Sequence, residues 1–88
     1  MNPITALILI SLGSTQAVKA QSTLLESVKR NPEEARALCR RFKDLNTKGN
    51  SASSTQAINE ISKEKNLSPI DAEILSTYVI GLNCPDVR

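Results

Sequence analysis

The chain has 88 residues with 11 Lys or Arg and 9 Asp or Glu, and a net charge of +2 does not require nucleic acid or an anionic membrane as partner. Its length allows one small domain, and 40% hydrophobic residues exclude both a disordered chain and a bundle of membrane helices. Phe42 and Tyr78 are the only aromatic residues, so an aliphatic core is expected, and the absence of His excludes histidine-based catalysis and histidine metal sites.

Residues 1–20 predict a secretory signal peptide. An apolar stretch at positions 4–12 is followed by polar residues, and Val18 and Ala20 occupy the −3 and −1 positions of a small-residue cleavage site. The alternative is an uncleaved anchor helix, although a membrane span needs roughly 20 consecutive apolar residues. We therefore expect an exported protein that is periplasmic, lumenal or extracellular, with membrane attachment only through a retained signal segment.

Residues 21–88 predict a single all-α domain, a compact bundle of three to four short helices closed by one disulfide. The helices are expected at about residues 24–30, 32–47, 54–65 and 69–82. Asn and Ser side chains can accept hydrogen bonds from the first free N–H groups of a helix, and Pro fits the first helical position. The start signals of this kind are Asn31 before Pro32, Ser53 or Ser54, and Ser68 before Pro69. Gly49 is expected to stop the second helix, and Asn66 to end the third in the left-handed conformation.

Two of the predicted helices carry most of the apolar residues. The second has a single apolar stripe at helical spacing, formed by Ala35, Leu38, Cys39, Phe42 and Leu45. The fourth is the most apolar segment after the signal peptide, with Ile70, Ile74, Leu75, Tyr78, Val79 and Leu82. We expect the fourth helix to be the central and most buried one.

The two cysteines predict one structural disulfide between Cys39 and Cys84, because an exported chain folds in an oxidising compartment. By the loop-entropy model such a bond stabilises the fold by roughly 4 kcal/mol. Buried free thiols and intermolecular pairing are the alternatives, and catalytic dithiols are normally much closer in sequence. Pro85 stops the fourth helix after Cys84, and residues 86–88 are expected to fray.

The segments EARALCRRFKDLNTKG and LSPIDAEILSTYVIGLNCPDVR resemble a family of small secreted domains known from actinobacteria, the domain-of-unknown-function family 732. The resemblance covers about residues 35–88. The matching residues are Ala35, Leu38, Cys39, Asp71, Ala72, Tyr78, Cys84 and Pro85. It implies a compact, helical, disulfide-linked secreted domain, and it implies no activity.

Four basic residues form the only concentration of charge, at Arg36, Arg40, Arg41 and Lys43. Arg36 and Arg40 lie one helical turn apart, where like charges repel mildly. The cluster is a possible patch for an anionic partner such as phosphate, a lipid headgroup or an acidic protein surface. The alternative is an ordinary solvated face, partly neutralised by Glu33, Glu34 and Asp44.

We expect no catalytic residues, no metal site and no cofactor, and therefore no enzyme. The acidic pairs at 33–34 and at Asp71 and Glu73 lie in first helical turns, where the helix dipole favours acids. The sequence favours a non-catalytic exported binding or accessory module with a protein partner and no nucleic acid. The alternative is a structural or assembly subunit of a larger extracytoplasmic complex, and the oligomeric state stays open.

Overall fold

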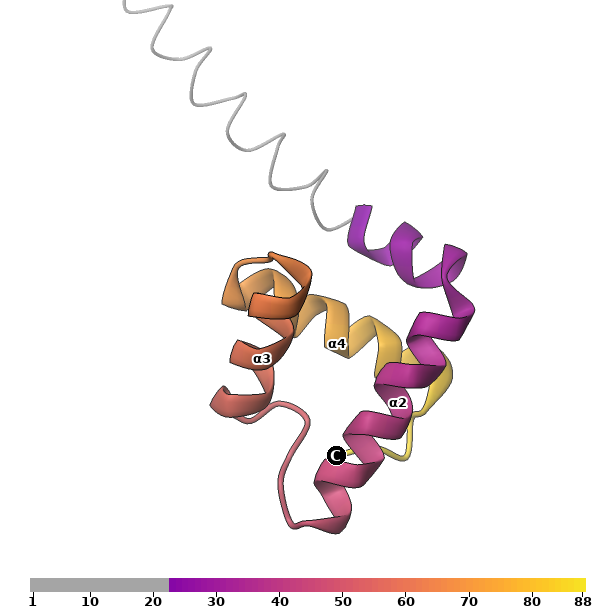
Figure 1. Ribbon diagram of the computed structural model, residues 1–88. Helices are drawn as coiled ribbons and strands as arrows, with labels where there is room; N and C mark the ends of the chain where they lie inside the picture. The colour runs from indigo at the N-terminus through magenta and orange to yellow at the C-terminus, as the bar shows by residue number, and fades with distance from the viewer. Residues whose placement is uncertain (1–22) are drawn as a thin grey trace, which may run out of the picture.

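The computed structural model describes residues 23–88, so the predicted signal peptide and its cleavage site lie outside the described residues. A short helix at 23–30 is followed by α2 (Pro32–Thr47), α3 (Thr55–Lys65) and α4 (Pro69–Asn83) (Figure 1). No strand occurs within this range, which confirms the all-α prediction and its helix boundaries to within a residue. In the same range, no helix is both long and apolar enough to span a membrane.

Ser54 and Ser68 cap α3 and α4 as predicted. The Ser54 hydroxyl accepts a hydrogen bond from the backbone N–H of Ala57 at 3.2 Å, and the Ser68 hydroxyl accepts one from Asp71 at 3.1 Å. Both serines have extended backbone angles, the usual geometry of an N-cap residue. Each cap satisfies one N–H group that the helix itself leaves without a partner.

Asn31 occupies the N-cap position of α2, but its side chain does not cap that helix. Instead, Asn31 Nδ2 donates to the backbone carbonyl of Ser27 at 2.8 Å. The capping role predicted for the Asn31 side chain is therefore wrong. Asn31 is the one residue between the 23–30 helix and α2. The last carbonyl groups of a helix have no partner within it, and the Asn31 side chain donates to one of these instead of accepting from the N–H groups of α2.

The helix ends follow the sequence signals. Gly49 has a φ of 83°, just after the last turn of α2, and Asn66 has a φ of 54° at the end of α3. The N–H of Leu67 donates to the carbonyl of Ser62 at 3.0 Å, which closes the α3 terminus around the left-handed Asn66. Both predicted stops are confirmed.

The core forms where α4 packs against both α2 and α3 (Figure 1). The largest fully buried side chains are Phe42, Ile61 and Val79, so each of these three helices contributes one. The 23–30 helix adds Leu24 and Val28 to the same cluster. The predicted central position of α4 is confirmed, and the core is aliphatic apart from Phe42 and the edge of Tyr78.

One side of α4 nevertheless faces solvent. Ile70, near the start of α4, is 71% exposed, and Leu82, near its end, is 55% exposed. The prediction that α4 is the most buried helix is therefore wrong for these two residues. The buried side is formed by Ala72, Leu75, Ser76 and Val79. Apolar residues surround α4 on almost every side, so sequence periodicity cannot single out the side that packs.

The disulfide between Cys39 and Cys84 is present, as predicted, and joins the middle of α2 to the residue that follows α4. The Cα–Cα distance between the two cysteines is 6.0 Å, within the usual range for such bonds. Both cysteines are buried in the core cluster. The bond connects residues 45 positions apart and so restricts the unfolded chain strongly.

Reduction of this disulfide is expected to lower the melting temperature by more than about 10 °C, because loop closure at this separation contributes about 4 kcal/mol in a domain of this size. Circular dichroism melts at 222 nm, with and without dithiothreitol, measure the shift. The double variant Cys39→Ala/Cys84→Ala is the control, and its melt should not respond to the reductant. An equal melting temperature of the native chain in both conditions would contradict a stabilising role of the bond.

Candidate functional site

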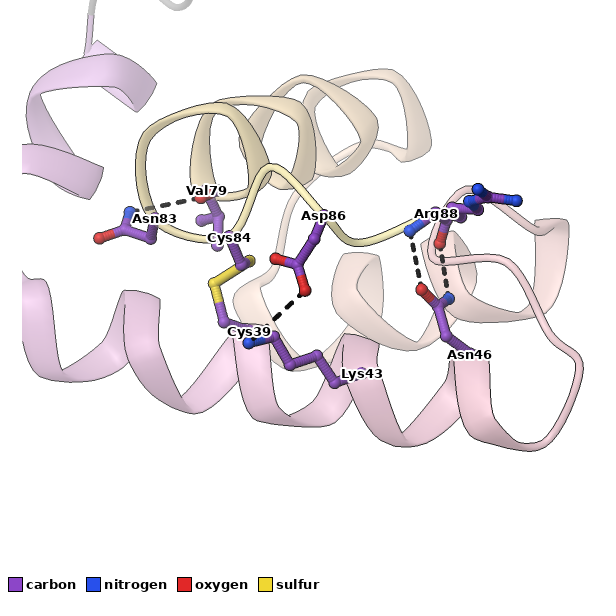
Figure 2. The surroundings of a disulfide bond; sticks show 8 residues. All are labelled: Cys39, Lys43, Asn46, Val79, Asn83, Cys84, Asp86 and Arg88. Atoms are coloured by element: carbon purple, nitrogen blue, oxygen red, sulfur yellow. Dashed lines mark hydrogen bonds and ion pairs between the residues drawn. A yellow bond between two sulfur atoms is a disulfide. The ribbon is translucent and has the colours of Figure 1, made fainter.

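The residues after Cys84 fold back along α2 (Figure 2). Cys84 and Val87 form a turn in which the N–H of Val87 donates to the carbonyl of Cys84 at 3.0 Å. The Val87 side chain is buried in the core. The disulfide thus begins a tail that stays in contact with the domain.

Asn46 fixes the last residue of this tail. Its Nδ2 donates to the carbonyl oxygen of Arg88 at 2.7 Å, and its Oδ1 accepts from the N–H of Arg88 at 2.7 Å (Figure 2). The same Arg88 carbonyl accepts a second hydrogen bond from the N–H of Ala52 at 2.8 Å. The expectation that residues 86–88 fray is therefore wrong.

The sequence contains only a weak signal for this contact. An Asn near the end of a helix is usually interpreted as a stop signal, and its pairing with a backbone 42 residues away depends on tertiary structure. The alternation of polar Asp86, apolar Val87 and polar Arg88 is the one local hint that the tail buries a side chain. The Arg88 carbonyl connects the last turn of α2, at Asn46, to the loop that precedes α3, at Ala52.

The predicted basic cluster is divided by the fold. Arg41 lies on the side of α2 that faces α3, where its Nη1 donates to Glu64 Oε1 at 3.1 Å and its Nη2 also pairs with Glu64 Oε2. A further contact joins Arg41 Nη2 to Glu60 Oε2 at 3.6 Å. The hydrogen bond to Glu64 raises the pKa of Arg41, and the same hydrogen bond lowers the pKa of the Glu64 carboxyl. Arg41 therefore connects α2 to α3 and is occupied within the domain.

The other three basic residues lie on a different side of α2. Lys43 is 3.9 Å from the carboxylate of Asp86, which makes a loose, exposed contact with the tail (Figure 2). Arg36 and Arg40 are exposed, and neither makes an ion pair within residues 23–88. Of the four residues predicted to form an anionic-partner patch, Arg36 and Arg40 are thus the two without an ion pair in residues 23–88, with Lys43 beside them.

An apolar cavity of about 160 Å³ lies among the 23–30 helix, α2, α4 and the end of α3. Its apolar wall consists of Leu24, Val28, Ala35, Leu38, Leu67, Leu75 and Val79. The polar side chains around it are Ser27, Asn31, Glu34 and Lys65, and the last two form an ion pair between α2 and α3. A space of this size and lining can take an apolar group of roughly the size of benzene.

The nucleophilic side chains of the core region are engaged with the backbone. Ser62 Oγ donates to the carbonyl of Leu67 at 2.5 Å, and the buried Ser76 Oγ donates to the carbonyl of Ala72 at 2.9 Å. Both cysteines are consumed by the disulfide. Within residues 23–88, no three His, Cys, Asp or Glu residues converge in a way that could hold a metal ion.

Asn46→Ala is expected to destabilise the domain by about 1–2 kcal/mol, because it removes two hydrogen bonds to the backbone of Arg88. Urea unfolding measures the loss, and hydrogen exchange at the Arg88 amide should become faster. Asn59→Ala is a matched control, since Asn59 is an exposed residue of α3. Equal stability of the two variants would show that the Asn46 contact does not hold the tail.

Neither the curated proteins nor the solved structures contain a match to the chain. A family model described as "Domain of unknown function (DUF8664)" matches residues 25–84, a span that includes α2, α3, α4 and most of the 23–30 helix and ends at the second cysteine of the disulfide. The resemblance to family 732 is not confirmed by this match. Because the match covers well over half of the sequence, the chain belongs to the DUF8664 family of domains of unknown function.

Proposed function

We propose that this protein is a non-catalytic, exported binding module that contacts an acidic surface of a protein partner through Arg36 and Arg40. The observation that carries this proposal is the unequal use of the four basic residues. Arg41 is paired with two glutamates of α3 and Lys43 lies near Asp86, whereas Arg36 and Arg40 make no ion pair within residues 23–88.

The spacing of Arg36 and Arg40 supports an anionic partner. Residues four apart on a helix are neighbours, and two like charges there repel by a few tenths of a kcal/mol. A carboxylate between them would relieve this repulsion, and each guanidinium can bind a carboxylate through two parallel N–H groups. Arg40 directly follows Cys39, so its backbone is bonded to a residue that the disulfide holds in place.

A rigid base also supports a binding role. α2 is tied to the chain end by the disulfide, to α3 by the Arg41 ion pairs, and to the tail by Asn46. A side chain carried on a fixed helix loses less freedom when it binds than one carried on a mobile loop. Arg36 and Arg40 are therefore presented from a helix with little freedom to move.

The chemistry of the chain supports the non-catalytic part of the proposal. The sequence has no His, and both cysteines are joined to each other. Several hydroxyl groups are hydrogen-bonded to the backbone of their own helices, as at Ser76 and Thr77. Nucleophilic catalysis needs a base beside the nucleophile, and these hydroxyls face carbonyl groups instead.

Export is supported by the sequence of residues 1–20 and is compatible with the disulfide. Disulfides persist in oxidising compartments and are rare in the cytosol. Small exported domains commonly depend on such a bond for a large part of their stability.

A second candidate function is that of an assembly subunit in a larger extracytoplasmic complex. The observation that favours it is the exposed apolar side of α4, with Ile70 and Leu82 in solvent. Native mass spectrometry of the protein from its host distinguishes the two functions, because an assembly subunit would be recovered in a stoichiometric complex with another protein.

The double charge reversal Arg36→Glu/Arg40→Glu is expected to abolish binding to an acidic probe, because it replaces the two unpaired arginines of α2 with anions. Poly-glutamate is the probe, and amide chemical shifts of residues 36–43 report its binding in NMR titrations. Binding to the native protein should weaken as salt rises from about 50 to 500 mM, since exposed charges are screened.

Lys29→Glu/Lys63→Glu is the matched control, because it changes the net charge equally at two exposed lysines on other helices. If both double variants lose poly-glutamate binding to the same extent, the contact depends on net charge alone and Arg36 and Arg40 have no special role. The same pair of variants, used in affinity capture from the extracytoplasmic fraction, tests which captured protein depends on the two arginines.

The intact mass of the protein recovered from its native host is expected to match residues 21–88 with two hydrogen atoms fewer, because of signal cleavage and the disulfide. Mass spectrometry before and after reduction and alkylation measures both changes. Recovery of a full-length chain from the membrane fraction would instead support the uncleaved anchor.

A further inference from the structure

The solvent-facing side of α4 carries an apolar strip that the rest of residues 23–88 covers only in part. Ile70, Ile74, Tyr78 and Leu82 follow one another at intervals of four, which places them along one side of the helix. Ile70 and Leu82 are 71% and 55% exposed, and Ile74 and Tyr78 are partly buried at the edge of the core. We refer to these four residues as the α4 strip. An exposed strip of this kind is typical of an interaction surface.

Gly81 adds a second, independent observation. It lies inside α4, where Gly is less favourable than any residue except Pro. A Cβ atom added at Gly81 would meet nothing within 4 Å, so no neighbouring atom in the described chain requires a glycine there. On the helix surface its neighbours are Thr77 and Tyr78, which precede it by four and three residues. A bare backbone at this place allows a second helix to approach closely.

The spacing of the α4 strip fits a partner that is a second copy of the same chain. Ile70 and Leu82 each lie six residues from Ser76, and Ile74 and Tyr78 each lie two residues from it. A two-fold axis at the level of Ser76 would therefore place Ile70 of one copy against Leu82 of the other. Such an axis makes the strip complementary to itself, which is the requirement of an isologous dimer.

Charge complementarity selects the antiparallel arrangement. The two charged residues of α4, Asp71 and Glu73, are both acidic and lie near its N-terminal end. Arg88 lies beside the other end of the helix, because it lines a surface hollow together with Thr77 and Gly81. Glu73, Thr77 and Gly81 follow one another at intervals of four residues, so Glu73 lies on the same flank of the helix as the other two. In an antiparallel pair the acidic end of each copy therefore reaches the Arg88 side chain of the other.

Neither Glu73 nor the Arg88 side chain has an ion-pair partner inside residues 23–88. The helix dipoles of an antiparallel pair also oppose one another, so the partial charges at the helix ends attract. A parallel pair would bring the acidic ends together. The electrostatic contacts thus fix the direction of the second helix, while the α4 strip supplies the contact area.

From these observations we propose that the α4 strip is the interface of an antiparallel, two-fold symmetric homodimer. A helix of 15 residues is about 22 Å long, so the contact is smaller than the roughly 800 Å² per partner of a standard interface. The dimer is accordingly weak and in rapid exchange with the monomer. This proposal does not depend on Arg36 and Arg40 or on the nature of their partner.

Sedimentation velocity over a concentration series tests the dimer, with the disulfide-bonded protein purified after expression of the full chain. Gly81→Arg is the main variant, because the added side chain projects into open space in the monomer and into the partner helix in the dimer. Gly81→Arg should keep the native circular dichroism spectrum and raise the dissociation constant at least about tenfold. Ala37→Arg, at an exposed position of α2, is the matched control and should leave the dissociation constant unchanged.

A charge exchange tests the antiparallel direction. Glu73→Arg and Arg88→Glu should each weaken the dimer, and the double variant should restore it, because the attraction between the two positions is re-established with reversed signs. A native protein that stays monomeric at every concentration overturns the proposal and leaves the α4 strip to another partner. A dimer that tolerates Gly81→Arg, or that Ala37→Arg also disrupts, overturns the assignment of the interface to α4.

Discussion

The covalent bond between Cys39 and Cys84 is the constraint on which the other contacts of this small domain depend. It holds the residue after α4 against the middle of α2, and the chain beyond it is then short enough to lie along α2. Lys43 meets Asp86 and Asn46 meets Arg88 only because of that placement. With one fully buried aromatic residue, Phe42, the core alone offers limited apolar area. The disulfide compensates by restricting the unfolded chain.

The fold also decides which charges remain available. Arg41 points toward α3, where Glu60 and Glu64 lie one turn apart and both reach its guanidinium. Arg36 and Arg40 project from another side of the same helix and have no acidic neighbour within ion-pair distance in residues 23–88. Four basic residues that are nearly adjacent in sequence therefore have two different roles. One is structural, and the proposed one is contact with an acidic partner.

α4 combines a buried side with a solvent-facing apolar side. On the side that packs against the core, the Ser76 hydroxyl is buried and donates its hydrogen bond to the carbonyl of Ala72 in the same helix. Ile70 and Leu82, near the two ends of the helix, are exposed to solvent, and a Cβ atom added at Gly81 would meet nothing within 4 Å in residues 23–88. The α4 strip and the pair Arg36 and Arg40 lie on different helices, so the proposed self-association and the proposed anion binding use different residues. A weak dimer would present two pairs of arginines to one partner, which would raise the avidity of the contact.

The sequence by itself determined the helices, their serine caps, their stops at Gly49 and Asn66, and the pairing of its two cysteines. These features depend on local backbone chemistry or, for the cysteines, on a choice with one intramolecular solution. Tertiary structure alone decided the ordered tail at Asn46, the division of the basic cluster and the exposed side of α4. Hydrogen bonds and ion pairs between residues 23 and 42 positions apart leave no local pattern, and a helix that is apolar all round does not reveal which side it buries.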